Sequence, residues 1–170
     1  MIKAQGHSLW ISPRGIAGDV LSAIIQNLSA MYKTPYFPPH VTLLARIIRP
    51  QSEVVALTRE LSSRCNSFSV ELTKSAFTHD YFRSLFIEAA PSGELLAAHR
   101  LAQALFDLPD ASYSPHLSLL YGNLPEAEKH EIIASLGRGF PTRFTAEAID
   151  VYATEGVPKN WRLVESVQLS

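Results

Sequence analysis

Two short stretches of this chain repeat one pattern of residue types: Pro39-His40-Val41-Thr42-Leu43-Leu44 and Pro115-His116-Leu117-Ser118-Leu119-Leu120. In both, a proline, a histidine, an aliphatic residue, a hydroxyl residue and two leucines follow one another in that order. Nearly half of the chain's 170 residues separate the two copies. This spacing predicts an internal duplication, with one copy in each half of the fold.

The segments around the two copies support that duplication. Each half reads as strand, helix, strand, helix, strand, and the second half has one further strand. We therefore predict a single domain over residues 1–170, with pseudo-two-fold halves of roughly 1–78 and 79–170. The predicted strands are residues 7–12, 40–47, 67–76, 82–89, 116–120, 144–154 and 161–169. The predicted helices are 19–31, with Val20, Ile24, Leu28 and Met31 on one stripe, 50–65, a helix capped by Ser92, and 125–137.

The repeated strands are expected to present polar residues on one face. Side chains alternate along a strand, so His40 and Thr42 share a face, as do His116 and Ser118, while the aliphatic residues between them face a core. If the halves pack about a pseudo-two-fold axis, two imidazoles and two hydroxyls meet across a cleft. A single histidine on a strand is more often structural than catalytic, but a polar pair kept in both copies favours function.

That set of side chains suits the cleavage of a phosphodiester. Histidine titrates near neutral pH, so one neutral imidazole can take a proton from water while a protonated one gives a proton to the leaving ribose oxygen. The hydroxyls can donate to phosphate oxygens, where charge builds in the transition state. The predicted catalytic residues are thus His40, Thr42, His116 and Ser118, with no metal and no cofactor. The pattern does not say which histidine is the base.

Composition limits the possible partners and locations. The formal net charge is −1 and the sequence pI is about 6.6, which argues against a grip on long nucleic acid. No apolar run is long enough to span a bilayer, and no secretory signal is visible, so we expect no membrane and a cytoplasmic location. The single cysteine, Cys65, excludes an intramolecular disulfide and is expected to be buried packing. We also expect a monomer, because two lobes already enclose the site.

The remaining histidines make weaker candidates. His99 and His130 lie on predicted helices among polar neighbours and are expected to be solvated, and His79 falls in a predicted turn. No pair has the spacing of a metal site. The aromatic residues Tyr36, Phe37, Tyr81 and Phe82 are candidates for lining the cleft, although such residues usually pack.

At the two repeated stretches the sequence resembles the 2H phosphoesterase superfamily, which is defined by two His-X-[Ser/Thr]-X motifs, and within it the cyclic phosphodiesterase branch of plants and yeast. Further stretches also match: Ser8-Leu9-Trp10, Phe37-Pro38-Pro39, Tyr81-Phe82-Arg83, Ser114 to Tyr121, Thr154 and Trp161. The resemblance covers nearly the whole chain. Arg83 departs from it, because the branch carries a neutral polar residue there.

The resemblance implies a bilobal α+β fold of the LigT type, with antiparallel sheets around a central cleft. It implies hydrolysis of a small ribose cyclic phosphate: a nucleoside 2′,3′-cyclic phosphate to its 2′-phosphate, or ADP-ribose 1″,2″-cyclic phosphate to the 1″-phosphate. It places Trp10, Tyr121, Tyr81 and Phe82 at the substrate. Two alternatives stay open: an enzyme that processes RNA ends, like 2′-5′ RNA ligase-like or 3′-end phosphodiesterase members, and a nucleotide-binding module without catalysis.

Overall fold

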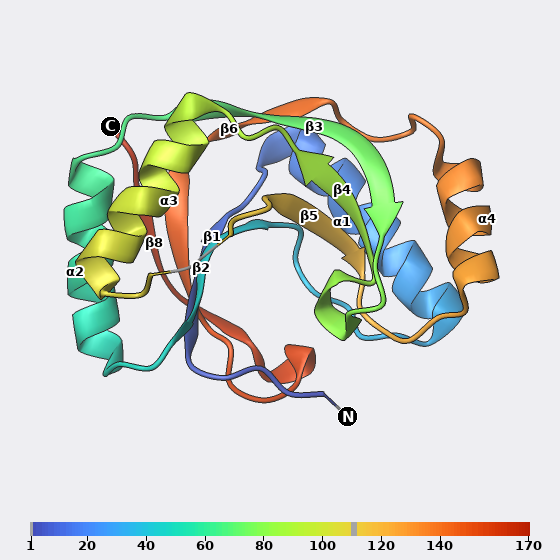
Figure 1. The fold of residues 1–170 in the computed structure, drawn as a ribbon, viewed down its shortest axis with the longest axis horizontal. Coiled ribbons are helices and arrows are strands. Elements are labelled where there is room, and N and C mark those ends of the chain that lie inside the picture. The colour runs from blue at the N-terminus through green and yellow to red at the C-terminus, as the bar shows by residue number, and fades with distance from the viewer. Residues whose placement is uncertain (1, 110–111) are drawn as a thin grey trace.

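A computed structural model describes residues 2–109 and 112–170 (Figure 1). Within these ranges the chain forms four α-helices and eight strands of one antiparallel sheet. The strands are β1 (His7–Ile11), β2 (Val41–Ile47), β3 (Phe68–Phe77), β4 (Leu85–Ala89), β5 (His116–Leu120), β6 (Arg143–Ala146), β7 (Ala148–Ala153) and β8 (Arg162–Gln168). The helices are α1 (Gly15–Tyr32), α2 (Gln51–Ser63), α3 (Gly93–Phe106) and α4 (Glu126–Leu136), with short 3₁₀ turns η1 (Tyr81–Arg83) and η2 (Pro158–Asn160).

The order of the strands is symmetric about the two repeated stretches. It runs β6-β3-β4-β5-β2-β1-β7-β8, so β5 and β2 are central and β4 and β1 flank them. Among the described residues, β2 and β5 pair only at Val41 and Leu117. The predicted α+β fold is confirmed. Each half of the sheet takes strands from both sequence halves, because β3 pairs with β4, and β7 pairs with β1.

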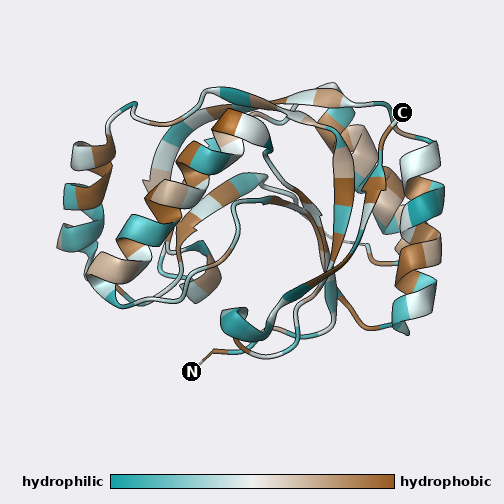
Figure 2. Ribbon diagram, turned by 180° about the vertical axis from the view of Figure 1, so that it is seen from behind, coloured by the Kyte–Doolittle hydropathy of each residue, from teal (hydrophilic) through white to brown (hydrophobic). Residues whose placement is uncertain are grey.

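The helices flank the curled sheet on its outer sides, α2 and α3 at one end and α1 and α4 at the other (Figure 1). Hydrophobic and hydrophilic bands alternate along them, as expected for helices with one face on a core (Figure 2). In α1 the buried residues are Leu21 and Ile25. Of the predicted stripe, Ile24 and Leu28 pack against the core, whereas Val20 and Met31 are 39% and 70% exposed.

Two predicted strands differ from the structure. Residues 144–154 form two strands, because the chain crosses at Glu147 from β6, beside β3, to β7, between β1 and β8. The apolar residues continue through the crossing, so no turn signal marks it. Residues 82–84 are outside β4 since η1 occupies the chain up to Arg83. The helix predicted over 50–65 ends at Ser63, and the predicted cap at Ser92 is confirmed by its hydrogen bond from the Leu95 amide.

Strand β2 bulges directly after the first repeated stretch. Between the pairs Leu9–Leu44 and His7–Ile47, β2 contains one residue more than β1. Arg46 lies in this bulge with a φ of +56°, the left-handed region that costs a residue with a side chain about 1–2 kcal/mol. Consequently the expected alternation stops: Ala45 and Arg46 are both exposed.

Candidate active site

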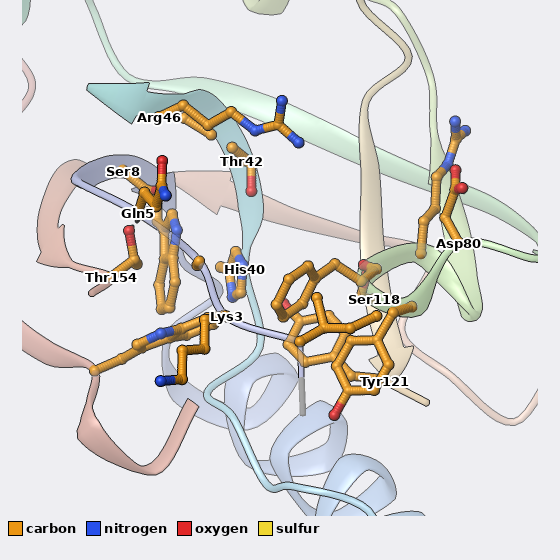
Figure 3. A pocket seen from close by; sticks show the side chains of 18 of the residues that line it. Lys3, Gln5, Ser8, His40, Thr42, Arg46, Asp80, Ser118, Tyr121 and Thr154 are labelled. Atoms are coloured by element: carbon orange, nitrogen blue, oxygen red, sulfur yellow. Dashed lines mark hydrogen bonds between the residues drawn. The ribbon is translucent and has the colours of Figure 1, made fainter. Parts of the chain in front are cut away.

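One pocket of about 690 Å³ contains all eight residues predicted from sequence, from both halves of the sheet. These are His40, Thr42, His116 and Ser118 of the repeated stretches, and Trp10, Tyr81, Phe82 and Tyr121. Figure 3 shows several of them turned toward a common space. The predicted convergence of the two repeated stretches on one pocket is therefore observed.

The two histidines are anchored in the same way. Nδ1 of His40 lies 2.7 Å from the carbonyl oxygen of Pro38, and Nδ1 of His116 lies 2.9 Å from that of Ser114. A carbonyl only accepts, so Nδ1 carries the proton in both rings and Nε2 is left for the pocket. In each copy a proline precedes the histidine and favours an extended residue before it. The repeated proline thus helps to place the carbonyl that orients each ring.

His40 is enclosed by aromatic residues. Its ring stacks on Trp10 with centroids 3.5 Å apart and planes within 4°, and the residue is 5% exposed. This burial, helped by the nearby His116, lowers the pKa of His40 to about 3. Tyr152 stacks on Trp10 at 3.8 Å. With a ring on each side of it, Trp10 offers the pocket an edge rather than a face, and its direct contact is with His40.

His116 lies in a more open environment. Its ring meets Phe86 edge-on at 5.1 Å, and the residue is half-buried. Burial lowers the pKa of His116, and the charge of Arg83 acts in the same direction. Arg83 is fixed beside it, because Nη2 donates to Ser114 Oγ at 2.8 Å and the guanidinium lies 4.6 Å from the Phe86 ring centre. The two imidazoles are therefore alike in anchoring and unlike in surroundings.

The two hydroxyls also differ. Ser118 Oγ donates to the carbonyl oxygen of Phe82 at 3.1 Å and the residue is 4% exposed. The Thr42 side chain is half-buried at the pocket and has no hydrogen-bond partner within residues 2–109 and 112–170. Thr42 is thus free to donate to a ligand, whereas Ser118 would have to release the carbonyl that it holds.

An aromatic wall closes another side of the pocket. Tyr121 is 4% exposed and stacks on Phe37 at 3.6 Å, and its burial raises the pKa of its phenol. Phe37 supports the wall from behind and is outside the pocket lining. Trp161 lies about 6 Å from both Tyr121 and Phe82 and is half-buried. It was noticed in the sequence only through the resemblance. Tyr36 points elsewhere, toward Ser22 at 2.8 Å.

The prediction that His99 is solvated is wrong. His99 is 5% exposed, and its Nδ1 lies 2.7 Å from the Leu43 carbonyl oxygen. Its ring stacks on Tyr113 at 3.7 Å, and Tyr113 donates to the carbonyl oxygen of Thr42 at 2.8 Å. Because α3 packs against β2, this polar pair satisfies backbone groups of the first repeated strand. The signal that could have indicated burial is its place four residues after Leu95, on the apolar face of α3.

For His130 and Cys65 the observed exposure is closer to what the sequence predicted. His130 is exposed and lies 3.5 Å from Glu126. Cys65 is a free, half-buried thiol packed against the core, and burial raises its pKa. In the part of the chain that the structure describes, no cluster of three or more histidine, cysteine or carboxylate side chains could hold a metal. Across the same residues, no helix combines the length and apolar character that crossing a membrane requires.

Two basic side chains at the rim, Lys3 and Arg46, were missed by the sequence reasoning, and Arg83 was noted there only as a departure from the family resemblance. Lys3, Arg46 and Arg83 line the pocket, together with Asp80. They come from the N-terminal segment, the β2 bulge and η1, which no sequence motif connects.

The fold and this site define a phosphoesterase of the 2H type. The model of the family described as "Cyclic phosphodiesterase-like protein" matches residues 5–169, and the chain belongs to that family. A cyclic phosphodiesterase of Arabidopsis thaliana is 22% identical over 129 residues, which cover 75% of this chain and 71% of the relative. A 2′,3′-cyclic-nucleotide 3′-phosphodiesterase of Yarrowia lipolytica is 24% identical over 165 residues, covering 73% and 76%.

Solved structures confirm the fold. The protein TT0787 of Thermus thermophilus superposes with a TM-score of 0.67 at 17% identity, covering 97% of this chain and 98% of that one. E. coli LigT in apo form gives 0.66 at 12% identity, with 99% of both chains covered. The predicted superfamily, its cyclic phosphodiesterase branch and the LigT-like fold are thus confirmed, and the chain is an enzyme of the phosphodiesterase class.

Proposed function

We propose that the chain hydrolyses ribose cyclic phosphates by two-histidine acid/base catalysis without a metal. The candidate substrates are nucleoside 2′,3′-cyclic phosphates, opened to 2′-phosphates, and ADP-ribose 1″,2″-cyclic phosphate, opened to the 1″-phosphate. The observation that carries the proposal is the matched anchoring of His40 and His116, each with Nδ1 on a carbonyl and Nε2 left for one pocket.

The relatives support a small nucleotide as the substrate. The Yarrowia lipolytica relative is named for cleaving the 3′ side of 2′,3′-cyclic nucleotides, which leaves the phosphate on the 2′ oxygen. E. coli LigT, which shares the fold with a TM-score of 0.62, has been solved with 3′-AMP. The near-neutral charge of this chain is also better suited to a small ligand than to long RNA.

The difference in surroundings supports His40 as the base and His116 as the acid. His40 is stacked on Trp10 and buried, so it stays neutral at pH 7 and takes a proton from the attacking water through Nε2. His116 is more open, and a bound phosphate anion favours its protonated form. In the reaction the water oxygen bonds to phosphorus, the bond from phosphorus to the ribose oxygen breaks, and His116 protonates that oxygen. Exchange with solvent then restores both rings.

Thr42 is the ready donor to a non-bridging phosphate oxygen, because its hydroxyl is uncommitted among the described residues. Charge gathers on these oxygens in the transition state, so a placed donor lowers the barrier. Trp161, Phe82 and Tyr121 would contact the base or sugar.

The experiment compares His40→Asn and His116→Asn with the wild type on adenosine 2′,3′-cyclic phosphate. Asparagine keeps an N–H at the place of Nδ1, so the contact with the carbonyl is retained while Nε2 is lost. Each change is expected to lower kcat by about 10²–10⁴-fold. His130→Asn, at an exposed helix position, is the matched control. Full turnover by either active-site variant, or loss of wild-type turnover in EDTA, contradicts the proposal.

A further inference from the structure

The pocket holds more positive charge than a cyclic phosphate requires. A ribose cyclic phosphate is a diester with one negative charge, and one protonated histidine already balances it. Lys3, Arg46 and Arg83 add three cations to the lining, against the single carboxylate of Asp80. The whole chain has a net charge of −1, so this excess is local to the pocket. Such a surplus suits a ligand with a second anionic group.

Arg46 has an unusual backbone for its place in the fold. Three non-glycine residues have a left-handed φ within the described ranges: Lys33, Arg46 and Asp107. Lys33 and Asp107 end helices α1 and α3, where this conformation is common. Arg46 instead lies within a strand, at the bulge of β2. Bulges beside active sites often redirect a side chain, and strain kept at such a place points to function.

The side chain of Arg46 is uncommitted. It is exposed and makes no ion pair or hydrogen bond with any residue that the structure describes. Arg83 differs, because it is tied to Ser114 and lies over Phe86. Figure 3 shows Arg46 extending over the pocket from the same strand as Thr42. The strained backbone therefore holds at the pocket a guanidinium that has no ion-pair or hydrogen-bond partner among the described residues.

There is also room for a larger ligand beside Arg46. A second hollow shares Thr42, Ala45, Arg46, Arg83 and His116 with the main pocket. Both arginines thus lie where the two hollows meet. The base and the 5′ carbon leave a ribose on opposite sides of its ring oxygen. A base against the aromatic wall would leave the 5′ group free to extend toward the arginines.

We propose that Arg46 binds a second phosphate, carried on the 5′ oxygen of the ribose whose cyclic phosphate is cleaved. The preferred substrate class is then a ribose cyclic phosphate with a 5′-phosphoryl group, rather than a plain nucleoside cyclic phosphate. This rests on the proposed function and assigns Arg46 as the residue that determines specificity. A guanidinium suits the task, since it can bind two phosphate oxygens at once.

The kinetic test compares adenosine 2′,3′-cyclic phosphate with the same molecule carrying a 5′-phosphate. In Arg46→Gly, KM for the 5′-phosphorylated substrate is expected to rise about tenfold, while KM for the plain substrate and kcat for both stay within about twofold. Glycine accepts a positive φ, so the melting temperature should be unchanged or higher, which separates lost binding from misfolding. Arg46→Lys should restore part of the loss, and Arg100→Gln, an exposed helix position, is the control.

A calorimetric titration tests the same contact without turnover. Adenosine 2′,5′-bisphosphate should bind the wild type more tightly than adenosine 2′-monophosphate, and Arg46→Gly should remove that preference. If no cyclic phosphate is hydrolysed but the preference and its loss are seen, the catalytic proposal fails and the Arg46 site stands. An equal effect of Arg46→Gly on both ligands, or a preference lost in Lys3→Gln instead, overturns the Arg46 proposal.

Discussion

The burial of His40 predicts that acid weakens the fold through this one residue. Its pKa is about 3 in the folded chain, against about 6.5 for a free histidine. Below pH 6.5 the His40 imidazole is therefore protonated in the unfolded chain but stays neutral in the folded chain. A depressed histidine pKa thus contributes stability that is complete above pH 6.5 and is lost as the pH falls toward 3.

The size of the effect follows from the two pKa values. Between pH 8 and pH 5 the wild type should lose about 2 kcal/mol of unfolding free energy through His40, because each pH unit below 6.5 is worth about 1.4 kcal/mol. His40→Asn removes the titrating group and keeps an N–H toward the Pro38 carbonyl. The difference in unfolding free energy between wild type and variant should shrink by that amount over this range.

Urea unfolding at a series of pH values measures this difference directly. Groups common to both proteins cancel in this comparison, so the difference reports on residue 40 alone. Parallel curves for wild type and His40→Asn from pH 8 to pH 5 would show that His40 is solvated and titrates normally. Burial would then no longer distinguish His40 from His116 as the base.

Four other substitutions separate the parts of the site. Thr42→Val should lower kcat by about 10²-fold with an unchanged melting temperature, as expected for loss of a transition-state donor. Ser118→Ala should lower the unfolding free energy by about 1–3 kcal/mol in urea unfolding, because the Phe82 carbonyl loses its hydrogen-bond partner. Trp161→Ala should raise KM about tenfold with little change in kcat, since a base stacked on an aromatic ring gains about 1–3 kcal/mol. Tyr113→Phe should lower kcat more than KM, because its hydroxyl holds the Thr42 carbonyl; unchanged steady-state kinetics would refute that positioning role.

The catalytic candidates could be found from sequence because the duplication marks them twice. His40 and His116 are ordinary residues alone, but their shared proline, hydroxyl and leucine neighbours placed them on matching strands. The helix caps were equally local, as at Ser92. Features that depend on residues adjacent in the sequence could thus be predicted.

Features that depend on residues distant in the sequence could not be predicted. The crossing at Glu147 is set by which strands lie beside β6 and β7, and the apolar pattern is the same on both sides of it. The polar contacts of buried His99 depend on how α3 packs on β2, because its ring meets the Leu43 carbonyl of that strand. The bulge at Arg46 follows from the register of β2 against β1, which no single strand encodes.

The proposed mechanism gives two near-identical motifs opposite tasks. The joined strands β2 and β5 present both rings through the same carbonyl contact, so symmetry supplies the two nitrogens on one pocket. Symmetry alone would give two groups of equal basicity and would not decide which ring takes the proton. The partners outside the motifs break it, because β1 offers Trp10 to His40 where β4 offers the smaller Phe86 to His116. In this proposal the strands beside the repeats set the basicity of each ring. Exchanging these two aromatic residues should therefore shift the pH dependence of kcat/KM, although both histidines keep their carbonyl contacts.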